Sequence, residues 1–223
     1  MTPKRPLQLA VLISGRGSNM TAIARACAGG QINARVSLVI SERPGVAGLD
    51  TARALGIDTR MVAWAGAADR LRFESALDET LAEVRPDLIV LAGFMRILSQ
   101  QFVEPRAGRI LNIHPSLLPM YPGLHTHRRV LAAGERLHGA SVHFVTAELD
   151  GGPVILQSRV AVQPGDTEVA LSARVQATEH IIYPRVIGWL ADGRLAWREE
   201  RPWFDGKPLA TPLVEDFDGS PQT

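Results

Sequence analysis

Short apolar runs alternate with segments of helical pattern through the first 93 residues of the chain. Residues 7–14 read LQLAVLIS and residues 87–93 read DLIVLAG, and such continuous apolar runs are typical of strands buried on both faces of a parallel sheet. Residues 34–41 and 58–64 predict two further strands. Helical segments separate the four strands, and the clearest of them, residues 68–84, ends at an Arg-Pro pair. This βαβαβαβ order predicts a doubly wound α/β fold.

The second half of the chain has a different pattern. Residues 109–114 predict another strand, and residues 141–162 predict two strands joined by a turn at residues 150–153. Apolar side chains alternate in this pair of strands, as expected for antiparallel pairing. A long helix follows over residues 167–193 and is closed by glycine. We therefore expect a mostly parallel sheet with an antiparallel C-terminal portion.

One domain accounts for most of the chain. The patterned segments show no repeat and no low-complexity linker, so we expect a single domain over residues 1–200 and a C-terminal tail over residues 201–223. The residues after Trp197 are rich in proline, aspartate and glycine, a composition that predicts poor order.

Charge and cysteine content limit the classes of partner. The 223 residues carry a formal net charge of +1, which gives no electrostatic reason to expect nucleic acid or an acidic membrane as partner. Cys27 is the only cysteine, so no internal disulfide can form. No apolar run reaches the ~18 residues of a membrane span, and the N-terminal apolar run leads into GRGSN without a cleavage site of small residues. We expect a cytoplasmic protein.

A glycine-rich turn joins the first strand to the first helix. Residues 14–19 read SGRGSN, and glycines at the start of a helix let backbone N–H groups approach an anion. The segment is neither the G-x-G-x-x-G of dinucleotide sites nor the G-K-[ST] of a P-loop. It predicts a site for a single phosphate around Gly17, Ser18 and Asn19. The alternative is an ordinary strand-to-helix turn.

Two polar side chains stand at the end of a strand. Asn112 and His114 alternate with apolar residues in LNIHPSLLP, so both lie on one face, and the proline that follows ends the strand. Two hydrogen-bonding groups are thus presented together where a strand becomes a loop. The alternative is a pair of buried polar groups that only satisfy each other or the backbone.

Asp150, in the predicted turn, is a candidate partner for His114. A carboxylate next to an imidazole fixes its tautomer and favours its protonated form, whereas the alternative is a turn aspartate before glycine. With that pair in place, Asn112 could hold an oxyanion while His114 stabilises charge or transfers protons. No serine or cysteine is spaced as a nucleophile, which favours direct transfer over a covalent intermediate.

The histidines do not form a metal motif. His125 and His127 are two residues apart, the others are scattered, and the chain has neither H-E-x-x-H nor a Cys/His cluster. We therefore expect no metal. His143 lies in an alternating strand, where it is either structural or part of the rim of a site.

Five segments together resemble a known family. They are VLISGRGSN, DLIVLAGFMRIL, LNIHPSLLPMYPGLHTH, GASVHFVTAELDGGPVILQ and RVQATEHIIYP. They are similar to the phosphoribosylglycinamide formyltransferase family over residues 7 to about 194. The Asn-His strand end with a later Asp-Gly-Gly is shared with the wider formyltetrahydrofolate-dependent transferases.

The resemblance implies a reaction. A formyl group would pass from 10-formyltetrahydrofolate, as co-substrate, to the amine of glycinamide ribonucleotide in de novo purine biosynthesis. The products would be formylglycinamide ribonucleotide and tetrahydrofolate, formed through a tetrahedral intermediate with Asn112, His114 and Asp150 as the catalytic set. The implied partners are these two small molecules, with no metal, and the enzyme would be a monomer or a homodimer.

The resemblance also implies residue roles, with nucleotide binding in the N-terminal half and folate binding in the C-terminal half. The ribonucleotide phosphate would lie on Gly17, Ser18 and Asn19. The same substrate would contact a helix segment formed by Gln176, Ala177, Thr178 and, near the glycinamide end, Glu179. The folate cleft would be lined by Arg70, Met95, Arg96, Ile97, Leu98 and Asn112 and covered by the loop of Thr146, Ala147, Glu148, Leu149 and Asp150.

Two details accompany these roles. One of the three prolines between His114 and Gly123 would follow a cis peptide bond, with Pro119 the favoured position. Arg16 departs from relatives that carry a small or neutral residue there, and it could add positive charge near the phosphate.

Three alternatives differ from this assignment. Methionyl-tRNA formyltransferase shares the Asn-His segment but would need a further basic domain after the catalytic one. Formyltetrahydrofolate hydrolase shares the core but carries an extra N-terminal regulatory domain. A non-catalytic nucleotide-binding module would not need Asn112, His114 and Asp150 together.

Overall fold

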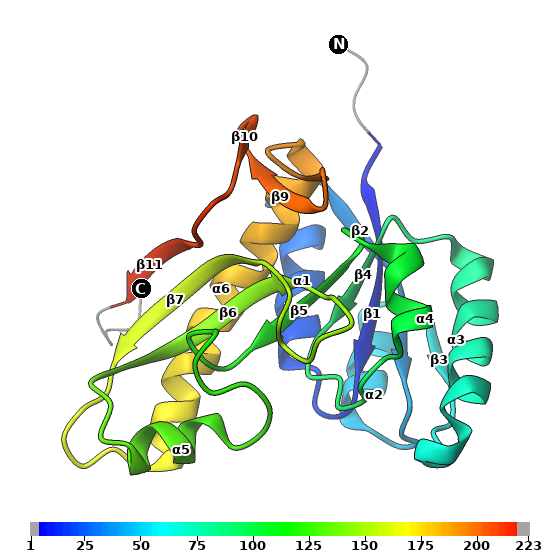
Figure 1. Cartoon of the computed structure of the whole chain (residues 1–223). Coiled ribbons are helices and arrows are strands. Elements are labelled where there is room, and N and C mark those ends of the chain that lie inside the picture. Colours follow the sequence, from blue (N-terminus) through cyan, green and yellow to red (C-terminus); the bar gives the residue numbers. More distant parts are fainter. Residues whose placement is uncertain (1–4, 218–223) are drawn as a thin grey trace.

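A central eight-stranded sheet organises the chain, as Figure 1 shows for the computed structural model, which describes residues 5–217. The strand order is β11-β7-β6-β5-β4-β1-β2-β3. The bounds of its strands are β1 (Leu7–Ile13), β2 (Ala34–Ser41), β3 (Thr59–Met61), β4 (Leu88–Leu91), β5 (Ile110–His114), β6 (Leu137–Phe144), β7 (Val154–Ala161) and β11 (Leu213–Phe217). A small second sheet contains β8 (Leu195–Arg198), β9 (Arg201–Phe204) and β10 (Lys207–Pro208).

The predicted change from parallel to antiparallel pairing is confirmed. Strands β3, β2, β1, β4 and β5 pair in parallel, whereas β5 with β6 and β6 with β7 are antiparallel. The loop between β6 and β7 is longer than the predicted four-residue turn, because β6 already ends at Phe144 and β7 begins at Val154. The carboxyl ends of β1, β4 and β5 therefore meet at one edge of the sheet.

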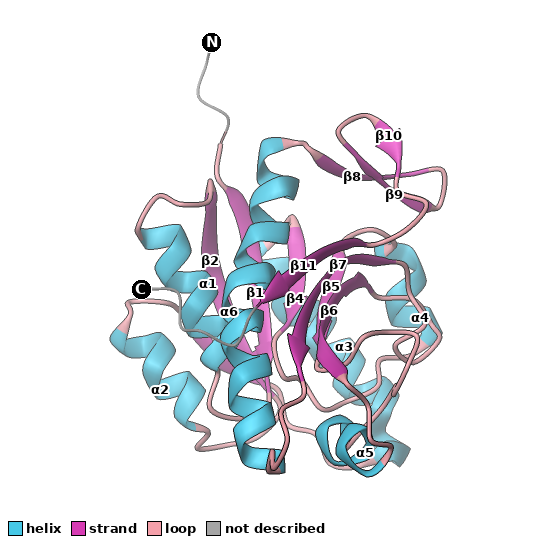
Figure 2. Ribbon diagram, turned by 90° about the vertical axis from the view of Figure 1, so that its left-hand side faces the viewer, coloured by secondary structure: helices cyan, strands magenta, loops and turns pink. Residues whose placement is uncertain are grey.

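Helices cover both faces of the sheet. Figure 2 shows α1, α2 and α6 in front of it and α3 and α4 behind it. Helices and 3-10 turns have the bounds α1 (Ser18–Ala28), α2 (Ala47–Ala54), α3 (Arg70–Val84), α4 (Gln100–Val103), α5 (Thr126–Ala132), α6 (Glu168–Asp192), η1 (Ala67–Asp69) and η2 (Glu104–Arg106). The sequence pattern does not predict the short helices α4 and α5, because four and seven residues are too few to show a helical period.

Alternate residues of β1 supply the two apolar layers. Leu9, Val11 and Ile13 pack into the layer shared with α1 and α6. Ala10 and Leu12 pack into the layer shared with α3. All five side chains are fully buried, so the continuous apolar pattern of this segment reflects burial on both faces.

The expected poor order after Trp197 is wrong for the residues that the structure describes there. Trp197 lies in β8 and its ring packs edge-on against Phe144, with centroids 4.9 Å apart. Strand β11 pairs in parallel with β7, and Arg159 forms an ion pair with Asp216 at 2.7 Å. Long-range pairing of this kind leaves no signal in local composition. Residues 218–223 of the predicted tail lie outside the described part of the chain.

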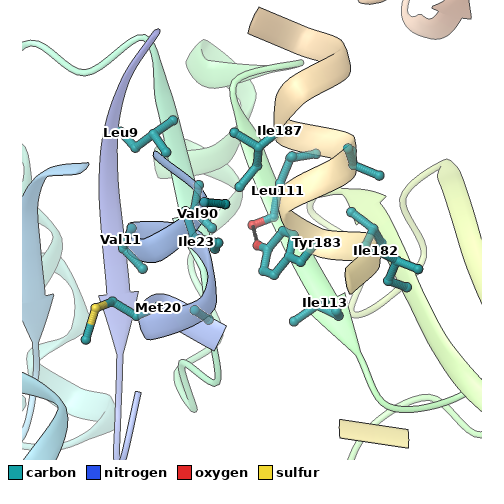
Figure 3. Close-up of a cluster of buried hydrophobic side chains, with 14 of the residues drawn as sticks. Leu9, Val11, Met20, Ile23, Val90, Leu111, Ile113, Ile182, Tyr183 and Ile187 are labelled. Carbon is teal, nitrogen blue, oxygen red and sulfur yellow. Dashed lines mark hydrogen bonds between the residues drawn. The ribbon is translucent and has the colours of Figure 1, made fainter. Parts of the chain in front are cut away.

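The sheet edge that carries Asn112 is tied to α6 by a buried tyrosine. Figure 3 shows the Tyr183 ring among the apolar side chains of the core. Its hydroxyl is shared between the carbonyl oxygens of Leu91, at 3.0 Å, and Leu111, at 3.1 Å. Burial raises the pKa of this phenol well above its ordinary value, so it remains a donor. The ends of β4 and β5 are thus held to the same helix.

We expect Tyr183→Phe to lower the free energy of unfolding by about 1–3 kcal/mol, the cost of leaving buried carbonyl groups without their donor. Urea denaturation measures the change. Tyr121→Phe is the matched control, because that hydroxyl bonds Glu135 at a partly exposed position. Equal losses in the two variants would contradict a special role for the Tyr183 hydroxyl.

Candidate active site

A cleft of about 730 Å³ opens at the carboxyl ends of β1, β4 and β5. In open α/β sheets, ligands bind at this edge, where the connections diverge to opposite faces. The cleft is lined mainly by the turn after β1, Arg43 after β2, the loop after β4, the end of β5, the segment that leads into α5, the loop between β6 and β7, and one face of α6.

The glycine-rich turn forms one end of the cleft. Gly17 has a φ of 72°, a left-handed conformation that glycine adopts without cost, and α1 begins directly after it at Ser18. Asn19 therefore lies inside the first helical turn and does not cap the helix. A β-carbon on Gly48 of α2 would lie 2.7 Å from the carbonyl oxygen of Gly15, so α2 packs directly against the turn. The first N–H groups of α1 face the cleft without intrahelical partners.

A buried amide and carboxyl group lie beside this turn. The Asn19 side-chain nitrogen donates to the Glu179 carboxyl group of α6 at 2.8 Å. Burial raises the pKa of Glu179 to about 7, and the hydrogen bond from Asn19 opposes that rise only in part. The Asn19 side-chain oxygen has no hydrogen-bond partner among the described residues. The pair therefore offers acceptors to a ligand with N–H groups.

His114, at the end of β5, has an acceptor beside each ring nitrogen. Its Nε2 donates to the carbonyl oxygen of Tyr121 at 3.0 Å, since a carbonyl can only accept. Its Nδ1 lies 3.5 Å from Oδ2 of Asp150, and that same oxygen accepts from the backbone N–H of Gly123 at 2.8 Å. Both ring nitrogens of His114 thus have an oxygen acceptor nearby.

Asn112 is oriented by a histidine that faces it across the β5–β6 pair. The Nδ1–H of His143 donates to the carbonyl oxygen of Phe144 at 2.9 Å, which leaves Nε2 to accept from the Asn112 amide nitrogen at 3.1 Å. Burial lowers the pKa of His143, which keeps this ring neutral. The amide nitrogen of Asn112 retains a second N–H for a ligand. Sequence alone does not decide the role of His143, and the signal that places it is the register Asn112↔His143.

The Asp-Gly-Gly segment has a steric cause. Asp150 adopts φ 52°, a left-handed conformation that aspartate tolerates better than most residues. A β-carbon on Gly152 would lie 1.8 Å from the carbonyl oxygen of Phe144. Only glycine fits there, and this close approach brings the Asp150 carboxylate back towards β5.

The proline loop is held from behind by β6 and β7. The peptide bond between Leu118 and Pro119 is cis, as predicted. The Ser141 hydroxyl accepts from the Leu118 N–H at 3.1 Å and donates to the Ser116 carbonyl oxygen at 2.7 Å, while Gln157 donates to the Leu118 carbonyl oxygen at 2.8 Å. These bonds fix the loop whose backbone contacts His114 and Asp150.

Apolar side chains of the loop after β4 and of the loop between β6 and β7 also line the cleft. Met95, Ile97 and Leu149 are 56%, 51% and 52% exposed, and all three belong to the lining. Exposed apolar side chains in a cleft are suited to contact with a flat ring system.

Most of the predicted site residues line this one cleft. They are Gly17, Ser18, Asn19, Met95, Arg96, Ile97, Leu98, Asn112, His114, Thr146, Ala147, Glu148, Leu149, Asp150, Gln176 and Glu179. Three predicted residues lie elsewhere. Arg70 lines a separate shallow hollow beside α4, Ala177 is exposed on α6, and Thr178 is buried against the Ser158 hydroxyl at 2.6 Å. The roles of individual residues towards substrates stay predictions.

Residues 5–217 contain no cluster of three or more His, Cys, Asp or Glu side chains that could hold a metal ion. Burial raises the pKa of the Cys27 thiol to about 11, so it is a poor thiolate nucleophile. Within the same described range, no helix is long and apolar enough to cross a membrane.

Comparison with known sequences identifies relatives along nearly the whole chain. Residues 7–187 match the formyl transferase family. Phosphoribosylglycinamide formyltransferase of Escherichia coli is 52% identical over 203 residues, which cover 91% of this chain and 96% of the relative. The human trifunctional purine biosynthetic protein adenosine-3 is 44% identical over 85% of this chain, and the match covers 19% of that longer protein.

Solved structures agree with these relationships. Phosphoribosylglycinamide formyltransferase of Coxiella burnetii superposes with a TM-score of 0.88 at 47% identity, covering 94% of this chain and 99% of that one. A formyltetrahydrofolate deformylase of Pseudomonas putida reaches a TM-score of 0.82 at 23% identity, with 92% of this chain and 72% of that one covered, and it therefore shares the fold alone. Family match, identity and fold lead to one conclusion: the chain belongs to the phosphoribosylglycinamide formyltransferases, folate-dependent enzymes of purine biosynthesis within the formyl transferase family.

Proposed function

We propose that the cleft binds glycinamide ribonucleotide and 10-formyltetrahydrofolate side by side and that formyl transfer between them is direct. The observation that carries this proposal is the convergence of a glycine-rich turn at a helix start, exposed apolar side chains and the His114–Asp150 pair in one cleft. The phosphate lies at the N–H groups of Gly17, Ser18 and Asn19. The folate ring lies between the loop after β4 and the loop between β6 and β7.

The substrate amine approaches along the wall formed by Asn19 and Glu179. It attacks the formyl carbon on N10, a C–N bond forms, and the formyl oxygen becomes an oxyanion. The free N–H of Asn112 and the His114 imidazolium stabilise that charge, the imidazolium by exchanging its bond to the Tyr121 carbonyl oxygen for one to the oxyanion. The bond from carbon to N10 then breaks, and the proton lost by the amine is delivered to N10, so atoms and charge balance.

Asp150 acts in this scheme on His114 and not on either substrate. Asp150→Asn keeps an oxygen for the Gly123 N–H and keeps the left-handed turn, but it removes the negative charge next to the imidazolium. We expect turnover to fall by about 10²–10³-fold with little change in either Michaelis constant, because the lost interaction matters most in the transition state. Steady-state kinetics measures both quantities.

Two further variants complete this test. His114→Ala should lower turnover as strongly, and the double variant should be little worse than either single one, since residues that act as a unit are non-additive. Asp216→Asn, in the exposed ion pair of β11, is the control. Raised Michaelis constants with unchanged turnover in Asp150→Asn would contradict the proposed role.

The phosphate site is tested by Gly17→Ala. A β-carbon at this left-handed position would lie 3.1 Å from the Gly48 α-carbon, so the turn must shift. We expect the Michaelis constant for glycinamide ribonucleotide to rise by about tenfold or more, as for the loss of one charge-assisted contact, while that for the folate stays unchanged. Gly30→Ala is the control, because φ there is 68° and nothing lies within 4 Å of the added carbon. A nucleotide seen elsewhere, with this turn empty, would refute the site.

Glu179 gives a prediction on pH and stability. Its pKa rises from 4.5 when unfolded to about 7 when folded, so folding favours the neutral carboxyl group. The resulting stabilisation is present at low pH and is lost as the pH rises towards 7. The stability of Glu179→Gln relative to the unsubstituted protein should therefore increase by up to about 1.4 kcal/mol for each pH unit between these two values, and it should not increase further above the higher value. Urea denaturation at pH 5 and pH 8 measures this, and a pH-independent difference would contradict it.

A further inference from the structure

A buried carboxylate lies behind the cleft without lining it. Glu42 directly follows β2, and its side chain is fully buried at 0% exposure. No residue in the proposed reaction scheme uses it. A buried charge is costly unless partners surround it, so its partners indicate its role.

The first partner is Ser14, the residue between β1 and the glycine-rich turn. The Ser14 hydroxyl lies 2.8 Å and 2.9 Å from the two carboxylate oxygens of Glu42 and donates to them. The same hydroxyl accepts from the backbone N–H of Met95 at 2.8 Å. The Ser14 N–H in turn donates to the carbonyl oxygen of Gly93 at 3.2 Å. The Ser14 hydroxyl oxygen thus connects the Glu42 carboxylate to the backbone of the loop after β4.

The second partner is Arg96, in that same loop. Its Nε lies 3.2 Å from Oε1 of Glu42, and its guanidinium group lies over the Trp64 ring, 5.2 Å from the centroid. Arg96 is itself part of the cleft lining. Arg43 approaches the same oxygen at 3.4 Å, but its side chain is half exposed. The buried charge is therefore shared with two arginines at the mouth of the cleft.

These contacts join the carboxyl ends of three neighbouring strands. Strand β1 lies between β4 and β2 in the sheet, and Glu42, Ser14 and Met95 follow β2, β1 and β4 respectively. We propose that Glu42 is a positioning residue that holds the loop of residues 93–98 in place through Arg96 and Ser14, and thereby sets the affinity for the formyl donor. This inference rests on the proposed function, which assigns that loop to the folate.

Stability alone does not account for the arrangement. A buried ion pair contributes little net stability, because the cost of desolvating two charges offsets their attraction. The ion pair and the hydrogen bonds instead act on one loop: the Glu42 carboxylate lies 3.2 Å from Nε of Arg96 and accepts from the Ser14 hydroxyl, which itself accepts from the Met95 N–H. The loop bears the exposed apolar side chains of Met95 and Ile97. Without the contacts to Glu42 and Ser14, these side chains would be freer to move in solvent.

The direct test is Glu42→Gln. Glutamine has nearly the same shape and can still accept from Ser14, but it no longer holds the Arg96 guanidinium by charge. We expect the dissociation constant of tetrahydrofolate, measured by calorimetry, to rise by about tenfold, because the loop loses the ion pair that holds Arg96. The Michaelis constant for 10-formyltetrahydrofolate should rise in parallel, while turnover and the Michaelis constant for glycinamide ribonucleotide stay within about twofold. Glu83→Gln, in an exposed pair with Arg60, is the control.

A readout independent of activity separates positioning from catalysis. Hydrogen exchange in the free enzyme should become faster at residues 93–98 in Glu42→Gln, with the core strands unchanged. Ser14→Ala removes the hydroxyl that accepts from Met95 and should show the same local effect while leaving the Glu42 side chain itself unchanged. If Glu42→Gln folds poorly, Ser14→Ala carries the test.

Arg96→Met distinguishes failure of this inference from failure of the function on which it rests. In that background the added Glu42→Gln change should alter folate affinity by less than about twofold, since coupled residues are non-additive. If Arg96→Met weakens folate binding and Glu42→Gln does not, the role of Glu42 is overturned and the folate wall stands. If neither Arg96→Met nor Ile97→Ala affects folate binding, the assignment of the loop to the folate fails, and this inference fails with it.

Discussion

The burial of β1 on both faces is the constraint on which the rest of the structure depends. Its side chains enter the two apolar layers alternately, so the strand cannot shift by one residue without reversing which side chains meet which helices. That register fixes where β1 ends, and therefore where the glycine-rich turn, Ser14 and the first turn of α1 lie. The packing of β1 therefore sets the position of the cleft independently of the polar groups that line it.

The antiparallel half adds what a purely parallel sheet would lack. At the carboxyl edge of a purely parallel sheet, only the ends of strands and their loops meet. Here the antiparallel β5–β6 pair places His143 directly opposite Asn112. The loop between β6 and β7 brings Asp150 back to His114. The active groups thus come from neighbouring strands that are far apart in sequence. Each is oriented by a second group, so little reorganisation is needed when charge develops on a substrate.

The sequence predicts strongly periodic or motif-bearing parts of this fold and misses those that depend on distant pairing. The β–α alternation, the antiparallel pair, the cis bond before Pro119 and the clustering of Asn112 with His114 and Asp150 followed from local pattern or resemblance. Strand β11 and the pairing of Glu42 with Arg96 did not, because both depend on contacts between remote segments. The family resemblance places Arg70 in the folate cleft, yet it lines the neighbouring hollow, since only the fold decides which way the start of α3 faces.

Strand β11 has a consequence for how copies of the enzyme meet one another. An uncovered β7 would offer a row of free backbone groups to any extended chain, which is how sheets join edge to edge into aggregates. Here β11 occupies that row, and β11 itself carries Glu215 and Asp216, paired with Arg185 of α6 and Arg159 of β7. The opposite edge is β3, which is only three residues long. One edge strand of the sheet thus carries charged side chains, and the other is very short. Both features disfavour self-association through backbone pairing.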